Sequence, residues 1–191
     1  MKVGLVIGLV CMMALGVGCA TRPETTASRD VLSSQVERAV ALFKITDPGI
    51  QAYFDRSYGY AVLPEVRKGA LVIGGAYGRG EVFARGVRVG YCSMSQASVG
   101  FSFGGQYFRE IIFFRDKADF ERVTAGSFTM SAQVTAVALT AGSASQTDYH
   151  YGMAVFIVAD QGLMVDASIG GQKFQYDPAF VMYDEPSTVL P

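Results

Sequence analysis

The chain has 191 residues, of which half are hydrophobic and 12% are aromatic, and its formal net charge is −1. A chain of this size and composition can bury a sizeable core, which excludes a disordered protein. The absence of a long Lys/Arg run argues against a duplex nucleic acid as partner, and a single histidine, His150, excludes a metal site built from several imidazoles.

The first 18 residues have the pattern of an export signal. Lys2 supplies the positive start, residues 3–15 the apolar stretch, and residues 16–18 the small side chains before Cys19. This arrangement resembles a bacterial lipoprotein signal, so we expect residues 1–18 to be removed and Cys19 to carry acyl chains such as palmitate. The alternatives are an ordinary signal peptide and a short membrane-spanning anchor.

Residues 19–28 are expected to be the lipidated cysteine and a polar tether. Residues 20–28 read ATRPETTAS and, even fully extended, reach only about 30 Å. In the bacterial lipoproteins that this segment resembles, Ala rather than Asp after the cysteine implies release to the outer membrane. We therefore expect a lipid-anchored protein that faces the periplasm.

Residues 28–44 are predicted to form an amphipathic helix with Ser28 as its N-cap. The apolar stripe of this helix packs on the domain's own sheet or enters a membrane. Its candidate membrane-contacting residues are Leu32, Val36 and Phe43. A second short helix is predicted from Asp47, which precedes a proline suited to a first helical turn.

The stretch from 69 to 115 is predicted to form antiparallel strands, because its apolar residues alternate in short runs separated by glycines. A further strand is expected over residues 58–63. Gly78 and Gly80 are expected where the chain changes direction between strands. The predicted fold class is α+β, with a strongly bent antiparallel β-sheet or small barrel and several packed helices. Cys92 is read as a buried thiol rather than a reactive one.

After these strands, a short helix is predicted from Asp116 to Gly126. Residues 128–141 favour a strand, with an Ala-rich helix as the alternative. Residues 151–158 and 163–169 are predicted to pair as a hairpin. Asp177 is expected to begin a last helical turn.

Enzymatic motifs are missing from the sequence. The glycines of residues 75–80 lack the Lys-Ser/Thr and the spacing of a nucleotide loop, so no nucleotide is expected. The nucleophile elbow G-x-S-x-G is also missing, and His150 follows a polar loop. We therefore expect no catalytic residue, no cofactor and no metal.

Basic side chains gather in the first predicted hairpins. If the hairpin ends meet on one side, they form a patch suited to anionic lipid headgroups. The other interpretation is that these charges protect strand edges from aggregation. The candidate headgroup residues are Arg67, Lys68, Arg79, Arg85 and Arg88.

An ordered series of motifs resembles the SYLF domain family. The motifs are YGYAVLP at 58–64, KGA at 68–70, GGAYGRG at 74–80, the segment 98–105, QGL at 161–163 and the glycine pair 170–171. The resemblance spans roughly residues 30–184, so we expect a SYLF-like domain over 29–185 and a tail over 186–191. It implies binding to phospholipid membranes, as in eukaryotic members, and an exported lipoprotein, as in many bacterial members.

The function expected from the sequence is therefore non-catalytic lipid or phospholipid binding by an envelope lipoprotein. Its expected partner is membrane phospholipid. The alternative is a structural envelope protein that binds a protein partner and has no lipid specificity.

Overall fold

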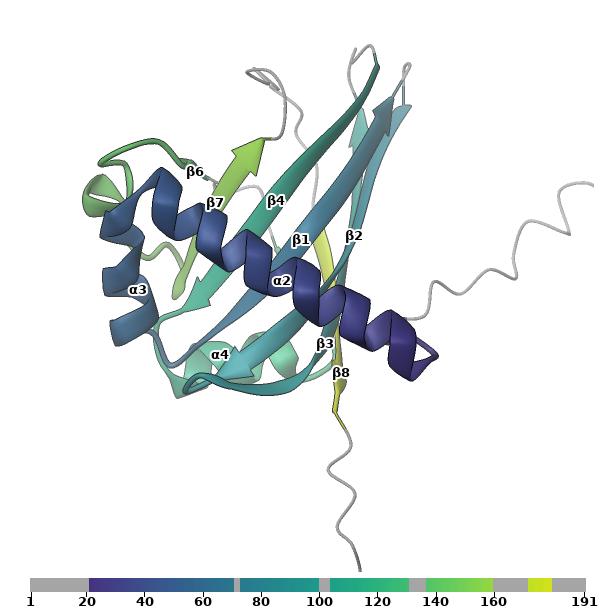
Figure 1. The fold of residues 1–191 in the computed structure, drawn as a ribbon, viewed down its shortest axis with the longest axis horizontal. Coiled ribbons are helices and arrows are strands. Elements are labelled where there is room, and N and C mark those ends of the chain that lie inside the picture. The colour runs from purple at the N-terminus through teal and green to yellow at the C-terminus, as the bar shows by residue number, and fades with distance from the viewer. Residues whose placement is uncertain (1–20, 71–72, 100–103, 131–136, 160–171, 180–191) are drawn as a thin grey trace, which may run out of the picture.

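A computed structural model describes residues 21–70, 73–99, 104–130, 137–159 and 172–179 (Figure 1). Its helices and 3-10 turns are α2 (Thr26–Thr46), η2 (Pro48–Ile50), α3 (Gln51–Arg56), α4 (Lys117–Thr124) and η3 (Ala144–Gln146). Its strands are β1 (Gly59–Ala70), β2 (Ile73–Ala84), β3 (Val87–Val99), β4 (Gly104–Phe114), β5 (Ser127–Met130), β6 (Val137–Ala138), β7 (Met153–Ala159) and β8 (Gln172–Pro178).

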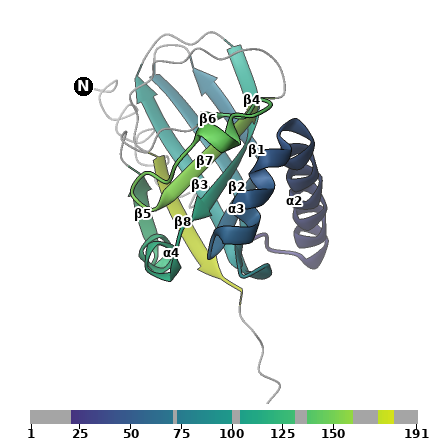
Figure 2. The same cartoon turned by 90° about the vertical axis from the view of Figure 1, so that its left-hand side faces the viewer.

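These strands form one sheet with the order β5-β8-β3-β2-β1-β4-β7-β6. Neighbouring strands are antiparallel, except that β6 and β7 run parallel. The long strands β1 to β4 lie at the centre, and the sheet curls into a half-barrel with helices packed on it (Figures 1 and 2). The predicted α+β class with a strongly bent sheet is confirmed.

The sheet has an inner and an outer face, each covered by its own apolar cluster. The inner face carries side chains from both ends of the sheet, and α4 packs against it through Val123. The outer face packs against α2 and α3, which lie together on one side of the sheet in Figure 2. This division matters for function because a charged residue has a different environment on each face.

A bulge in β1 exchanges the faces of its two halves. Ala61 and Leu63 are inner residues, but the register against β2 shifts between Val62 and Glu65, and the next inner residue is Val66. Such a bulge inserts an extra residue and reverses the alternation beyond it. As a result Arg67 points outward and Lys68 inward.

Two predicted helix starts are confirmed by their caps. Asp47 accepts a hydrogen bond from the amide of Gly49 at 2.9 Å at the start of η2. Asp116 accepts one from the amide of Asp119 at 2.9 Å at the start of α4. In both cases the aspartate satisfies an amide that the first helical turn leaves without a partner.

Helix α2 begins earlier than predicted, so most of the expected tether is folded. Thr25 and Ser28 form a reciprocal capping box, and the helix starts at Thr26. Pro23 is buried, and Thr21 bonds to Ser93 of β3 with a 3.1 Å separation between the two hydroxyl oxygens. Polar composition indicated a free segment, but these local hydrogen bonds hold it against the sheet.

The last helical turn predicted at Asp177 is wrong, because Asp177 and Pro178 end strand β8 and pair with β3. Pro178 occupies the terminal position of the strand, where a missing amide is tolerated. Gly78 and Gly80 also differ from expectation, since they lie in the middle of β2 rather than at a turn.

The described part of residues 128–141 is extended in β5 and β6, while residues 131–136 lie outside the described residues. Strand β7 is confirmed. Its predicted hairpin partner, residues 163–169, lies outside the described residues, and the described neighbours of β7 are β4 and β6. Cys92 is buried as predicted.

Candidate functional site

A groove of about 220 Å³ opens between the first turns of α2 and the outer face of β1 and β2. Its walls combine proline and aliphatic side chains with two guanidinium groups. The lining residues are Pro23, Ser28, Val31, Leu32, Gln35, Pro64, Glu65, Arg67 and Arg79.

The two arginines of this groove are diagonal neighbours on adjacent strands. Arg79 on β2 is the cross-strand neighbour of Glu65 on β1, and Arg67 lies two residues beyond Glu65 on β1. Diagonal neighbours in an antiparallel pair are about 7–8 Å apart, so one anionic group can contact both. Only Glu65 supplies a carboxylate to the groove lining, and its Oε1 lies 2.5 Å from Arg67 Nε.

A tyrosine ring supports each guanidinium. The guanidinium carbon of Arg67 lies 5.6 Å from the ring centre of Tyr107, and that of Arg79 lies 5.9 Å from the ring centre of Tyr77. Arg79 Nε also donates to the Tyr77 hydroxyl at 3.0 Å. Cation–π contacts of this kind orient a cation while leaving the remaining N–H groups available to an anion.

The opposite wall is the start of α2, whose aligned peptide dipoles give it a partial positive charge. The first turn of α2 contains no acidic residue to offset that charge. Ser28 faces the groove from this turn and Val31 from the next turn, and Val31 is 57% exposed. The groove therefore combines two cations, one of them paired with Glu65, with a helix N-terminus and an exposed aliphatic side chain.

The other basic candidates lie elsewhere. Lys68 is on the inner face with 7% exposure, and burial lowers its pKa. Arg85 occupies the β2–β3 turn and stacks on Tyr58. It lies eight residues along the chain from Tyr77, the cross-strand partner of Arg67, which is roughly 26 Å. Arg88 is bound to Glu81, with a 2.7 Å distance from Nη1 to Oε1. Of the five predicted headgroup residues, the structure brings together Arg67 and Arg79.

The candidate membrane-contacting residues of α2 face the sheet. Leu32, Val36 and Phe43 are all buried in the outer-face cluster, and Phe43 is fully buried. They therefore pack on the domain's own sheet, which was one of the two interpretations of the stripe. Contact with a membrane through these side chains would require α2 to leave the sheet.

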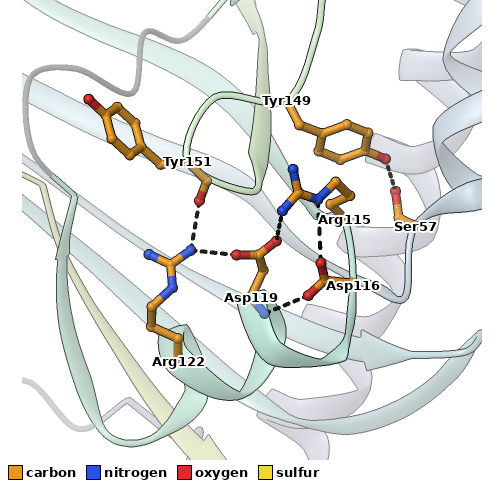
Figure 3. Close-up of polar contacts among 7 residues, drawn as sticks. All are labelled: Ser57, Arg115, Asp116, Asp119, Arg122, Tyr149 and Tyr151. Atoms are coloured by element: carbon orange, nitrogen blue, oxygen red, sulfur yellow. Dashed lines mark hydrogen bonds and ion pairs between the residues drawn. The ribbon is translucent and has the colours of Figure 1, made fainter.

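A second polar cluster joins α4 to the segment before β7 (Figure 3). Asp119 lies between two arginines, 3.2 Å from Arg115 Nη2 and 2.8 Å from Arg122 Nη2. Arg122 also donates to the carbonyl of Tyr151 at 2.6 Å. These ion pairs and the hydrogen bond to Tyr151 join α4 to the segment before β7, so the cluster is interpreted as a structural clamp.

The clamp depends on the close approach of Gly152 and Asp119. A Cβ atom at Gly152, whose φ is +78°, would lie 2.0 Å from the Asp119 carboxyl. Nearby, the hydroxyl oxygens of Ser57 and Tyr149 are 2.7 Å apart and tie the start of β1 to the same segment (Figure 3). Neither contact supplies a paired base for nucleophilic chemistry.

The sequence interpretation missed the supporting residues of the groove, which are Pro23, Val31, Tyr77 and Tyr107. Tyr77 and Tyr107 both pair with Arg67, so a correct strand register would have identified them. The available sequence signal was one tyrosine in each strand that flanks β1. It becomes informative only once the bulge in β1 is placed, because the bulge decides which residues lie opposite these tyrosines.

Among the described residues, no helix has the length and apolarity needed to cross a membrane. Nor do three or more His, Cys, Asp or Glu side chains of the described segments gather in a way that could hold a metal ion.

No protein-family model matches the chain. The chain is similar to beta cell expansion factor A of Aeromonas veronii, with 28% identity over 151 residues. The match covers 78% of this chain and 58% of that relative, so the chain spans less than two thirds of the relative's length. The relative's name states an effect on beta cells and identifies neither a ligand nor a reaction for the present chain.

Proposed function

We propose that this protein is a non-catalytic lipid-binding protein of the bacterial envelope that holds anionic headgroups in the groove beside α2. The observation that carries the proposal is that Arg67 and Arg79 both line the groove, next to the exposed Val31. Guanidinium groups bind phosphate through several N–H donors, and an adjacent aliphatic side chain can enter the headgroup region. The resemblance to SYLF domains supports the same function.

The proposed location is the periplasmic face of the outer membrane, with Cys19 as the lipid anchor. The sequence before Cys19 supports this anchor. Lipidation would place the domain at a surface where each cation attracts anionic lipid. Weak binding by the groove would then suffice, because the anchor keeps its local concentration at the membrane high.

The groove is tested by pelleting residues 20–191, which contain every described element, with phosphatidylcholine vesicles that include or lack phosphatidylglycerol. We expect binding to the anionic vesicles at low salt and weaker binding as salt screens the charges. The double variant Arg67→Gln/Arg79→Gln loses about 2 kcal/mol of attraction, about 1 kcal/mol for each cation, and should bind roughly thirtyfold more weakly. The amount of protein in the pellet measures this.

A charge-matched control is Arg38→Gln/Arg85→Gln, which removes the same charge from exposed positions outside the groove. If this control loses as much binding as the groove variant, general attraction rather than the groove explains the binding. If the folded parent binds neither kind of vesicle, the lipid proposal fails and the alternative of a protein partner is favoured.

The lipid anchor makes a separate prediction. Intact mass of the protein purified from membranes should equal that of residues 19–191 plus acyl chains on Cys19. Each buried CH₂ contributes about 0.8 kcal/mol to membrane binding, so several chains hold the protein firmly. Cys19→Ser should release it from the membrane fraction, and retention of that variant as tight as the parent's would contradict the anchor.

A further inference from the structure

Residues 21–24, here called the strap, are fastened to the outer face of the sheet. The hydroxyl oxygens of Thr21 and Ser93 are 3.1 Å apart. Arg29 Nε donates to the carbonyl of Pro23 at 3.1 Å, and the side chain of Pro23 is buried. The guanidinium of Arg22 lies 5.9 Å from the ring centre of Tyr91. Each described strap residue before Glu24 therefore has a contact with the domain.

The strap lies directly beside the anion groove. Ser93, which bonds Thr21, is the cross-strand partner of Arg79. Pro23 itself forms part of the groove wall. Two residues of chain span at most about 7 Å, so the Cα atom of Cys19 lies within that distance of Thr21 whatever the path between them.

This juxtaposition restricts which membrane the groove can reach. A free tether of residues 20–28 would let the domain turn away from its anchor and contact a second membrane. A fastened strap instead keeps the Pro23 wall of the groove within about 14 Å of Cys19, because Pro23 is the fourth residue after Cys19. That distance is of the order of the Debye length at which headgroup charges act.

We infer that the groove binds anionic headgroups in cis, in the same leaflet that holds Cys19, and does not bridge two membranes. This inference rests on the proposed function and adds the source of the lipid. The strap limits the distance between the groove and Cys19, and Arg67 and Arg79 contact the headgroup.

The test couples residues 19–191 through the Cys19 thiol to a maleimide-bearing lipid in phosphatidylcholine vesicles. Cys92 is buried, so coupling is confined to Cys19. Phosphatidylglycerol vesicles are then added, and light scattering reports clustering of the two populations. The comparison variant carries about ten Gly/Ser residues between Ala20 and Thr21, which adds roughly 35 Å of reach.

We expect no clustering by the parent and clear clustering by the variant with the insertion, and Arg67→Gln/Arg79→Gln in that variant should abolish it. Equal clustering by the parent would overturn the cis inference while leaving the proposed function intact. Failure of the insertion variant to cluster would overturn the proposed function, and the cis inference with it.

Binding in cis is measured directly by a tryptophan, since the chain contains none. Ala27→Trp places the reporter at an exposed position next to Ser28 of the groove but outside the groove lining. The anchoring vesicles are prepared with or without phosphatidylglycerol. We expect acrylamide, a neutral quencher that the anionic surface does not repel, to quench the tryptophan several-fold less when the anchoring vesicles contain phosphatidylglycerol. Arg67→Gln/Arg79→Gln should remove that protection. Equal quenching with both kinds of vesicle would contradict binding in cis.

Discussion

Replacing Gly80 with alanine is expected to lower the free energy of unfolding by about 3 kcal/mol, which is at the upper end for overpacking. A Cβ atom at Gly80 would lie 2.0 Å from the carbonyl oxygen of Val62 and 3.1 Å from the Cα atom of Leu63. Both are backbone atoms of the neighbouring strand, so relief requires the two central strands to separate. Urea unfolding of the parent and of Gly80→Ala measures the difference.

The matched control is Gly75→Ala, the same change on the same strand. A Cβ atom there meets its nearest neighbour, the carbonyl oxygen of Gln96, at 3.4 Å, which is an ordinary contact. We expect Gly75→Ala to change stability by less than about 1 kcal/mol. Equal destabilisation by the two variants would show that general loss of glycine, and not the close approach at β1, sets the effect.

The reason for Gly78 and Gly80 therefore differs from the one inferred from sequence. A direction change or positive φ was expected, but both residues lie within β2, where a Cβ atom would contact the backbone of β1. At Gly78 the obstacles are Val66 and the carbonyl of Glu65. Glycine content predicted strong bending of the sheet, but only the pairing of β1 with β2 reveals which atoms come close.

Local signals predicted the helix starts well, because a cap is decided within a few residues. Asp47 before a proline and Asp116 before α4 are both caps in the structure. The prediction placed the N-cap of α2 three residues too late, at Ser28 instead of Thr25. They act together in one capping box, which moves the helix start toward the N-terminus.

The candidate site could be predicted only in part, because side-chain direction depends on register. Simple alternation from Ala61 and Leu63 would place Arg67 inside and Lys68 outside. The bulge after Val62 produces the opposite arrangement. The five predicted basic residues are divided among the groove, the inner face, the β2–β3 turn and, for Arg88, an ion pair with Glu81. Composition cannot reveal a shift of one residue in pairing.

Glu110 on β4 lies on the inner face of the sheet, opposite Leu63 of β1. Its carboxyl is fully buried, and neither oxygen has a hydrogen-bond partner. Burial raises the pKa of Glu110 to about 7. Glu110 also affects Cys92 on β3. Burial is the main cause that raises the pKa of the Cys92 thiol, and the charge of Glu110 is the next largest.

Glu81 offers a matched comparison because it is also buried but on the outer face. Its Oε1 accepts hydrogen bonds from Ser33 and Arg88, each at 2.7 Å. The hydrogen bonds to Glu81 compensate for its burial, whereas Glu110 has only the cost of burial. The two glutamates should therefore respond to amidation in opposite ways.

We expect the stability of Glu110→Gln, measured relative to the parent at the same pH, to be higher above pH 7 than at low pH. Below the ordinary pKa of 4.5, Glu110 is protonated in the folded and unfolded chains, so it adds no pH dependence. From there to about 7 only the unfolded chain ionises, so the parent progressively loses stability, by about 3 kcal/mol in total at about 1.4 kcal/mol per pH unit. Urea unfolding across this pH range should show the loss of stability in the parent and in Glu81→Gln, but not in Glu110→Gln. Glu81→Gln should also be less stable than the parent. A difference between the parent and Glu110→Gln that stays constant from pH 4.5 to 7 would show that folding does not raise the pKa of Glu110.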